Sequence, residues 1–187
     1  MRFVGATRKQ VGKHINDDAF AVFDGMFAFL MDGAGDARGA AHKCIDTIKS
    51  YQPQMPSFNQ LVTLLNMTLI GYGAESTLLA IKVEGNFLSG VSCGDSPLYV
   101  IRDGQLLRLN KNTKPRLGTS RPEIYQIALS LKRHDVIIAA SDGFVLDGDK
   151  LVGTVGQHIS NPGELSEALL EAQTYCGDDV TVITRVI

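Results

Sequence analysis

The stretch Met26–Ala41, MFAFLMDGAGDARGAA, decides the fold. Residues 26–31 form an apolar run rich in aromatic and long side chains and bounded by turn signals, which is typical of a buried strand. We predict that this strand ends at Asp32-Gly33, and a carboxylate at the end of a buried strand is costly unless it is paired or binds a metal. The small residues 39–41 then open a helical pattern. The chain is therefore expected to deliver one acidic side chain and one backbone carbonyl to the rim of a core.

The composition is that of an ordinary globular chain, and we predict one domain over residues 1–187. With 44% hydrophobic and 20% charged residues, the chain is long enough to bury a proper core. The formal net charge of −2 indicates no basic face for nucleic acid. No apolar run approaches the roughly 20 residues that span a bilayer, and the N-terminal MRFVGATRKQ lacks the apolar segment of a signal peptide. We expect a cytoplasmic monomer that binds neither nucleic acid nor membrane.

The three cysteines, Cys44, Cys93 and Cys176, are widely spaced and form no CxxC pair. This spacing argues against a disulfide framework and against a zinc site. A reducing cytoplasm is the compartment in which such unpaired thiols are ordinary.

Two-stranded units joined by tight turns predict a largely antiparallel structure. The expected strands cover residues 2–7, 18–23, 26–31, 76–83, 87–93, 97–101, 105–109, 124–131, 135–140 and 180–186. Four antiparallel pairs are expected: 18–23 with 26–31, 76–83 with 87–93, 97–101 with 105–109, and 124–131 with 135–140. The expected helices are 36–51 with Asp36 as its cap, 57–70 with Ser57 as its cap, and 163–175. The predicted fold class is α+β, a sandwich of two antiparallel sheets with helices on the outside.

Acidic residues recur at the ends of the expected strands. They are Asp17-Asp18, Asp32, Asp95 after GVSCG, Asp142 after VIIAAS, and Asp178-Asp179 before VTVI. A lone Asp-Gly pair usually marks only a turn, but Asp32 and Asp142 directly follow strands of buried character. Carboxylates gathered at one place raise each other's pKa unless a cation compensates their charge. Oxygen ligands favour Mg²⁺ or Mn²⁺ over Zn²⁺.

The chain resembles the metal-dependent protein phosphatases of the PP2C type. The segments NDDAF, LMDGAG, ESTLLAIKV, GVSCGDSPLYVIRDGQLLRL, VIIAASDG and GDDVTVI occur in the family's order and cover nearly the whole chain. The resemblance implies the PP2C-like α-β-β-α sandwich. It also implies hydrolysis of phosphoserine or phosphothreonine in a protein, by a water that bridges two Mn²⁺ or Mg²⁺ ions.

The resemblance implies roles for individual residues. Asp32 would bridge the two metal ions, and Asp18 would hold metal-bound water. The other metal ligands would be Asp17, the Gly33 carbonyl, Asp142 and Asp178, with Asp95 and Asp142 contributing to a weaker third site. Lys13 would bind the substrate phosphate, and His14 beside it could reach the substrate.

Several positions depart from the family pattern. Asp17 stands where the family usually has Glu. Lys13 stands where the family often has an arginine that grips the substrate phosphate, and lysine supplies charge without a bidentate fork. Ala34 stands where many members have a histidine proposed as general acid. The segment between Leu109 and Ile124 is short, so the flap that helps larger members to select substrates is expected to be nearly absent.

These departures leave two alternatives open. One is a catalytically weak regulatory module that keeps the fold and binds a partner kinase or another regulator. The other is a metal-dependent hydrolase of small phosphorylated metabolites or nucleotides. A comparison of a phosphopeptide with free phosphoserine and nucleotides as substrates would separate the second alternative from a protein phosphatase.

Overall fold

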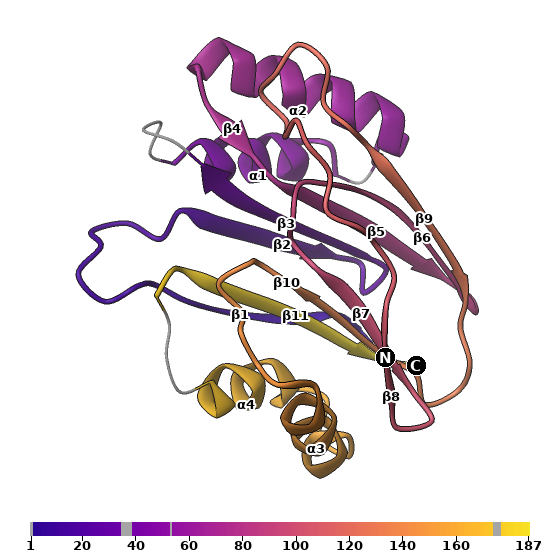
Figure 1. The fold of residues 1–187 in the computed structure, drawn as a ribbon. Coiled ribbons are helices and arrows are strands. Elements are labelled where there is room, and N and C mark those ends of the chain that lie inside the picture. The colour runs from indigo at the N-terminus through magenta and orange to yellow at the C-terminus, as the bar shows by residue number, and fades with distance from the viewer. Residues whose placement is uncertain (1, 35–38, 53, 174–176) are drawn as a thin grey trace.

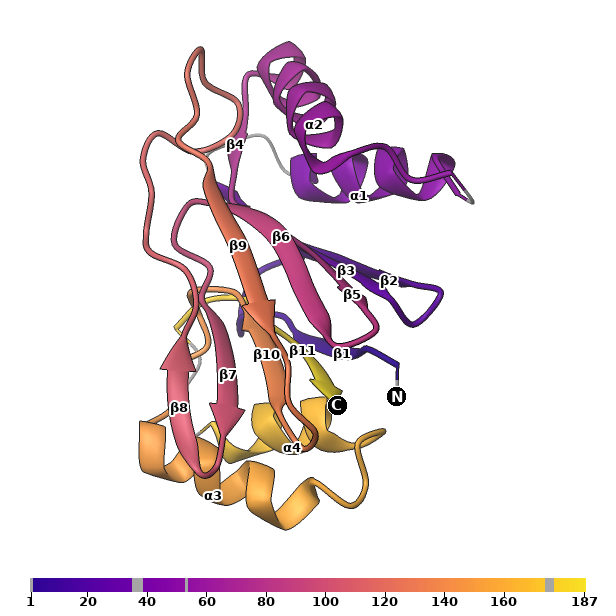
Figure 2. The ribbon, with the colours of Figure 1, turned by 90° about the vertical axis from the view of Figure 1, so that its right-hand side faces the viewer.

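The computed structural model describes residues 2–34, 39–52, 54–173 and 177–187, and its elements stack as helices, sheet, sheet and helices (Figures 1 and 2). The β1 sheet contains, in spatial order, β1 (Val4–Arg8), β11 (Val180–Val186), β10 (Val136–Ala140), β7 (Leu98–Arg102) and β8 (Gln105–Arg108). The β2 sheet contains β2 (Asp18–Phe23), β3 (Phe27–Ala34), β5 (Leu78–Glu84), β6 (Phe87–Cys93) and β9 (Tyr125–Ser130), with β4 (Glu75–Ser76) beside β3. These strands pair antiparallel, as predicted.

Helices cover the outer faces of both sheets. Helices α1 (Ala40–Ser50) and α2 (Phe58–Tyr72) pack on the β2 sheet, and α3 (Gly148–His158) and α4 (Leu165–Ala172) pack on the β1 sheet (Figure 1). The predicted α+β fold class, with two facing sheets and helices outside, is confirmed. No helix in the described part of the chain is both long and apolar enough to cross a membrane.

Three apolar layers hold the stack together. Leu30 of β3 and Ile137 of β10 are buried between the two sheets. Their neighbours face outward: Phe29 and Met31 pack toward α1 and α2, and Ile138 packs toward α3 and α4. Because successive residues of a strand point to opposite faces, a strand buried on both sides reads as a continuous apolar run. This explains why β3 and β10 were recognisable in the sequence.

The predicted pairing of residues 124–131 with 135–140 is wrong. β9 pairs with β6 in the β2 sheet, whereas β10 pairs with β7 and β11 in the β1 sheet. All residues of β10 are buried, so this strand needs a neighbour on each side, whereas β9 is half exposed and suits the edge of a sheet. The short connection between them therefore crosses from one sheet to the other.

The strand β3 was predicted to end at Met31, but it runs on to Ala34. Gly33 pairs with Ser76 of β4, and its amide donates a hydrogen bond to the Asp17 carbonyl at 3.2 Å. A Cβ atom at Gly33 would lie 3.1 Å from that carbonyl oxygen, a tight contact that favours glycine. Asp32 thus lies within a paired strand, which fixes its position more firmly than a strand end would.

The helices differ from expectation in two respects. α1 begins at Ala40 and α4 ends at Ala172, so both are shorter than predicted. The helix α3 was not predicted. Its side-chain cap is Asp147, which accepts hydrogen bonds from the amides of Asp149 and Lys150. Glycines at 148, 153 and 156 weaken the helical pattern in the sequence, because glycine has a low helix propensity. The predicted cap Ser57 is confirmed, with a reciprocal capping box to Gln60.

A few predictions lie outside the described residues. They concern the helix cap Asp36 and the thiol of Cys176. Cys44 and Cys93 are buried free cysteines, and burial raises the pKa of both thiols, Cys44 to about 12 and Cys93 to about 11. Both therefore behave as small apolar core residues.

Candidate active site

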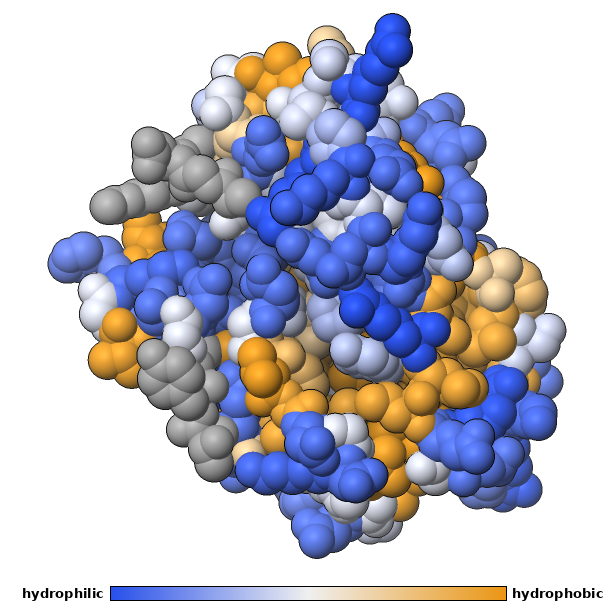
Figure 3. All heavy atoms as spheres, viewed as in Figure 1, coloured by the Kyte–Doolittle hydropathy of each residue, from blue (hydrophilic) through white to orange (hydrophobic). Residues whose placement is uncertain are grey.

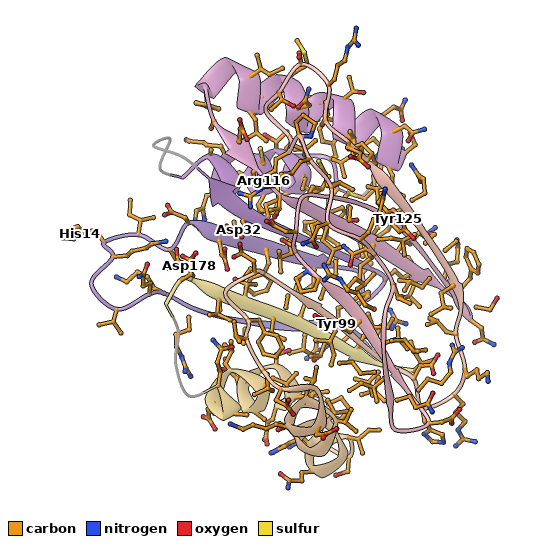
Figure 4. All side chains as sticks on the ribbon, viewed as in Figure 1. His14, Asp32, Tyr99, Arg116, Tyr125 and Asp178 are labelled. Atoms are coloured by element: carbon orange, nitrogen blue, oxygen red, sulfur yellow. The ribbon has the colours of Figure 1, made fainter. Side chains whose placement is uncertain are left out.

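Three of the predicted carboxylates converge where strand ends of the two sheets meet. Asp18 opens β2 and lies in register with Asp32 of β3. Asp142 follows β10 of the other sheet, and it lies near enough to Asp32 to raise the pKa of the Asp32 carboxyl group. We call Asp18, Asp32 and Asp142 the acidic centre. Figure 4 shows Asp32 and Asp178 on the same side of the molecule, and in Figure 3 hydrophilic residues gather in the middle of this face.

Burial and neighbouring negative charges raise the pKa values of carboxyl groups in the acidic centre. Burial raises the pKa of Asp18 to about 6, although hydrogen bonds from the hydroxyls of Ser141 and Thr181 lower it. Burial, and then the charges of Asp18 and Asp142, raise the pKa of Asp32 to about 9. Because the negative charge of both carboxyl groups is disfavoured, a cation bound between them would be stabilised.

Hydroxyl side chains of the segment around β4 fix the backbone of Asp32. The Asp32 amide donates to Thr77 Oγ1 at 3.1 Å, and the Asp32 carbonyl accepts from Ser76 Oγ and from the Thr77 amide, each at 2.9 Å. Thr77 Oγ1 also lies 2.8 Å from Ser96 Oγ. All three hydroxyl residues are buried. The peptide groups of Asp32 are thereby satisfied, and its carboxylate is left for the acidic centre.

Lys13 lies among a second group of carboxylates, which the loop of residues 9–17 brings to the same face. Its Nζ lies 2.9 Å from Asp178 Oδ1, 3.0 Å from Asp179 Oδ2 and 3.5 Å from Asp17 Oδ2. Burial alone would lower the pKa of Lys13, but the contacts with Asp178 and Asp179 raise it, so the ammonium group stays charged. Lys13 therefore neutralises two of the predicted metal ligands, Asp17 and Asp178.

Asp179, for which no role was predicted, fixes this loop. Its side chain accepts hydrogen bonds from the amides of Gln10 and Asp17, both at 2.7 Å. Burial alone would raise the pKa of Asp179, but these bonds and the Lys13 ammonium lower it, so the carboxylate stays ionised. The sequence shows only that two acids precede the last strand. It does not show which of them faces the loop.

Asn16 and His42 also hold the loop and were not predicted. Asn16 Nδ2 donates to Thr7 Oγ1 at 2.7 Å, and Asn16 Oδ1 accepts from the Asp18 amide at 2.9 Å. His42 Nε2 of α1 lies 2.8 Å from the Asn16 carbonyl oxygen. Asp17 and Asp18 therefore follow a residue that is anchored on both sides.

Asp95 lies against an arginine that was not predicted. Arg116 Nη2 donates to both carboxylate oxygens of Asp95, at 2.8 and 2.7 Å. Figure 4 places Arg116 next to Asp32, and the positive charge of Arg116 acts on the carboxyl groups of both Asp32 and Asp142. The role of Asp95 in a third metal site stays a prediction, and Arg116 competes for the same oxygens.

His14 is not brought to the acidic centre. It is exposed, and Figure 4 shows it on the outer part of the loop, away from Asp32 and Arg116. With Lys13 and Asp17 it lines a small open pocket of about 270 Å³. Its predicted contact with a substrate therefore stays a prediction and would involve groups outside the reacting phosphate.

The donor set fits a hard divalent cation, although the side chains need to adjust. Within the described residues, no three or more His, Cys, Asp or Glu side chains already surround a point where a metal could bind. Yet Asp18 Oδ2 is buried without a hydrogen-bond partner among these residues, and a buried acceptor of this kind is costly. Carboxylate oxygens are the ligands that Mg²⁺ and Mn²⁺ prefer. The ion pairs of Lys13 show that part of this carboxylate group already binds a positive charge.

Comparison with known proteins gives structural matches only. No family model and no curated protein sequence matches the chain. The serine/threonine phosphatase PstP/Ppp of Mycobacterium tuberculosis superposes with a TM-score of 0.84 at 21% identity, over 98% of this chain and 97% of that one. PppA, described as a key regulatory component of the T6SS in Pseudomonas aeruginosa, gives 0.78 at 20% identity, over 100% and 99%.

A structure of the PstP catalytic domain in complex with two manganese ions gives a TM-score of 0.77 at 18% identity, over 98% of this chain and 96% of that one. These superpositions cover nearly the whole of each chain, so they compare complete folds. The chain therefore has the fold of the PP2C-type serine/threonine phosphatases.

Proposed function

We propose that the protein is a metal-dependent phosphatase that hydrolyses phosphoserine or phosphothreonine in proteins. The observation that carries the proposal is the acidic centre: Asp18, Asp32 and Asp142 lie together, and Asp18 Oδ2 is buried without a partner among the described residues. A fold shared with phosphatases and a carboxylate cluster that requires a cation support the same function. The proposed cofactors are two Mn²⁺ or Mg²⁺ ions.

Each residue at the site would have its own role in metal binding or in orienting the attacking water. Asp18, Asp32 and Asp142 would hold one ion, and Asp17, Asp178 and the Gly33 carbonyl would complete the ligand set. The bound ions would supply an activated water and neutralise the phosphoryl charge. The buried Asp18 Oδ2 would accept a hydrogen bond from the attacking water and orient it toward phosphorus. The hydrogen bonds of Thr77 and Ser76 would keep Asp32 in place.

Lys13 is expected to move when metal binds. Its ammonium group now lies between Asp17, Asp178 and Asp179. A divalent ion at Asp17 and Asp178 would repel it, and the lysine side chain is long and flexible. The displaced ammonium group would then add positive charge near the substrate.

A regulatory module is the second candidate. The ion pairs of Lys13 favour it, because an internal ammonium group that neutralises Asp17 and Asp178 lets the fold exist without metal at these residues. PppA, which shares the fold, is described as a regulatory component. In this candidate the acidic face binds a partner kinase or another regulator and turns over little substrate.

A substrate panel tests the proposal. Wild-type protein with Mn²⁺ is given a phosphothreonine peptide, free phosphoserine and a nucleotide, and phosphate release is measured. We expect the peptide to be hydrolysed with at least tenfold higher kcat/KM than the small molecules, and Asp32→Asn to remove most of that activity. Preference for the free compounds would instead favour a hydrolase of small phosphorylated molecules. No turnover of any substrate, despite metal binding by calorimetry, would favour the regulatory module.

A further inference from the structure

Arg116 belongs to the short segment between β8 and β9 that was expected to be a nearly absent flap. The segment is firmly attached to the β2 sheet. Leu117 is fully buried and exchanges two backbone hydrogen bonds with Ser76, at 3.1 and 3.2 Å. Thr113 and Gly94 bond each other through the Thr113 amide and hydroxyl, both at 2.9 Å. These contacts therefore hold the segment in place beside the strand that carries Asp32.

The neighbouring Gly118 shows how closely this segment packs against the end of α2 and the start of β4. Gly118 has a φ of +93°, and a Cβ atom there would lie 1.9 Å from the Ala74 carbonyl oxygen. Only glycine fits that backbone position. Ser76, which pairs with Leu117, also donates its hydroxyl to the Asp32 carbonyl. Arg116 and Asp32 are thus positioned by the same few residues.

Among the described residues, the guanidinium group of Arg116 is held by Nη2 alone. Nη2 donates to both oxygens of Asp95. Nε is buried and donates to no described residue, and Nη1 makes no hydrogen bond to the described part of the chain either. The side chain is 19% exposed, so part of it reaches solvent. Asp95 thereby orients a guanidinium group whose Nη1 still has donors to offer.

The surroundings of Arg116 suit an anion that arrives from solvent. Arg116 lines an open pocket of about 270 Å³ with Lys114, Pro115 and Glu75, so one further cation and one carboxylate lie beside it. Its charge also acts on Asp32 and Asp142, the carboxyl groups of the acidic centre. A phosphate group bound at that centre would therefore lie within reach of the positive field of Arg116.

Lys13 is a weaker candidate for the same task. Its ammonium group is shared among Asp17, Asp178 and Asp179. A lysine also presents a point charge, whereas a planar guanidinium group matches the oxygens of a phosphate. The arginine that the family often has at the position of Lys13 is missing here, and Arg116 supplies a guanidinium group from another part of the chain.

We propose that Arg116 binds the substrate's phosphate group, the task predicted for Lys13, and that Asp95 is a positioning residue for Arg116 rather than a metal ligand. The ligand class is a dianionic phosphate monoester on a protein, so this inference rests on the proposed function. Inorganic phosphate, which shares the chemistry, serves as the probe even if turnover is low.

The test measures binding of inorganic phosphate to Mg²⁺-loaded protein by equilibrium dialysis, together with kcat and KM on a phosphothreonine peptide. We compare Arg116→Met, Arg116→Lys, Asp95→Asn and Lys13→Met, with Arg121→Met as the matched control, since Arg121 is exposed on the same segment. Arg116→Met is expected to weaken phosphate binding and raise KM by roughly ten- to hundredfold, the range for a lost charged hydrogen bond. Arg116→Lys should lose less. Lys13→Met should weaken phosphate binding less than Arg116→Met does.

Asp95→Asn distinguishes positioning from metal binding. A positioning role predicts weaker phosphate binding, a higher KM and an unchanged number of bound Mn²⁺ ions by calorimetry. Loss of a bound ion in Asp95→Asn would overturn the proposal. A second result would also overturn the proposal: Arg116→Met binds one more Mn²⁺ ion than the wild type and binds phosphate as tightly. The guanidinium group would then only take the place of a metal ion. Thermal unfolding of each variant checks that it is folded, and the double variant Arg116→Met with Asp95→Asn avoids an unpaired buried charge.

The two proposals fail in different ways. If the protein hydrolyses no phosphopeptide but Arg116→Met still weakens phosphate binding, the phosphatase function is wrong and the role of Arg116 in binding phosphate stands. If the peptide is hydrolysed and phosphate binding is the same in wild type, Arg116→Met and Arg121→Met, the inference about Arg116 is wrong and the phosphatase function stands.

Discussion

At the scale of single residues, Asp32 shows how burial turns an ordinary side chain into a cation site. Its backbone is fixed by hydroxyl groups, and its carboxyl group lies beside those of Asp18 and Asp142. Like charges at short range in a partly buried place are unfavourable until a cation arrives. The metal-free protein is therefore expected to be stabilised by any change that removes one of these charges.

Asp32→Asn is expected to raise the melting temperature of the metal-free protein and to reduce the stabilisation by Mn²⁺. At a metal concentration of about 100 times Kd, one bound ion stabilises a fold by about 2.7 kcal/mol, which corresponds to roughly 5–10 °C for a chain of this size. The wild type should show this shift, and the variant should show a clearly smaller one. Thermal unfolding with and without Mn²⁺ measures both effects.

Asp24→Asn is the matched control, because Asp24 is exposed at the other end of the same β2–β3 hairpin. It should shift with Mn²⁺ as the wild type does. Equal shifts in Asp32→Asn and Asp24→Asn would contradict a metal site at Asp32.

The convergence of Asp18, Asp32 and Asp142 was predictable, because each lies at a strand with a recognisable apolar pattern. Arg116, Asp179 and Asn16 were not. Arg116 lies in a segment without periodicity, and its partner Asp95 is distant in sequence. Asp179 and Asn16 act through contacts with backbone groups of the loop, and no local pattern encodes such contacts.

At the scale of elements, a buried ion pair links β7 to the turn before β10. Arg102 Nε and Nη2 donate to the two carboxylate oxygens of Asp135 at 2.9 and 2.6 Å, and the Lys132 amide donates to Asp135 at 2.8 Å. Asp135 is 1% exposed. Burial alone would raise the pKa of Asp135, but Arg102 and the Lys132 amide lower it below the usual value.

This ion pair is expected to stabilise the fold above the unfolded-state pKa of aspartate, about 3.9, and to lose that effect as the pH falls through the lower folded-state pKa. The sign follows because the unfolded chain binds the proton more readily than the folded one. The free energy of unfolding, measured in urea from pH 7 to pH 2, should differ between wild type and Asp135→Asn by a constant amount above about pH 5 and by less below about pH 4. A difference that stays constant down to pH 2 would contradict this role.

Element pairing was harder to predict than element type. The strands 18–23, 87–93 and 180–186 were predicted with the bounds that the structure has. The pairing of β9 with β10 was wrong because a short turn suggests a hairpin, whereas burial on both faces places β10 between β7 and β11. Helix α3 was missed because its glycines hide a helix that packing on the β1 sheet stabilises.

At the scale of the whole molecule, the candidate site exists only when both sheets are assembled. Asp18 and Asp32 come from the β2 sheet, whereas Asp142 and Asp178 follow or precede strands of the β1 sheet. The apolar layer between the sheets, which includes the fully buried Leu30, fixes the distance between these edges. The sequence predicted this arrangement through its resemblance to the PP2C-type phosphatases, which rests on six short motifs in the family's order.

The activity of the chain depends on whether this arrangement accepts metal. Lys13 now neutralises Asp17 and Asp178, so metal has to displace an internal cation before the proposed site is complete. A titration with metal therefore tests the whole account, from the acidic centre to the phosphatase function.

The most direct measurement is the hydrolysis of a phosphothreonine peptide by metal-stripped protein, titrated with Mn²⁺ and then with Mg²⁺, with Asp32→Asn alongside. We predict no turnover without metal, a saturable rise in rate with Mn²⁺, and loss of most of that rate in Asp32→Asn. Turnover that is independent of metal, or equal in Asp32→Asn and wild type, would contradict the account.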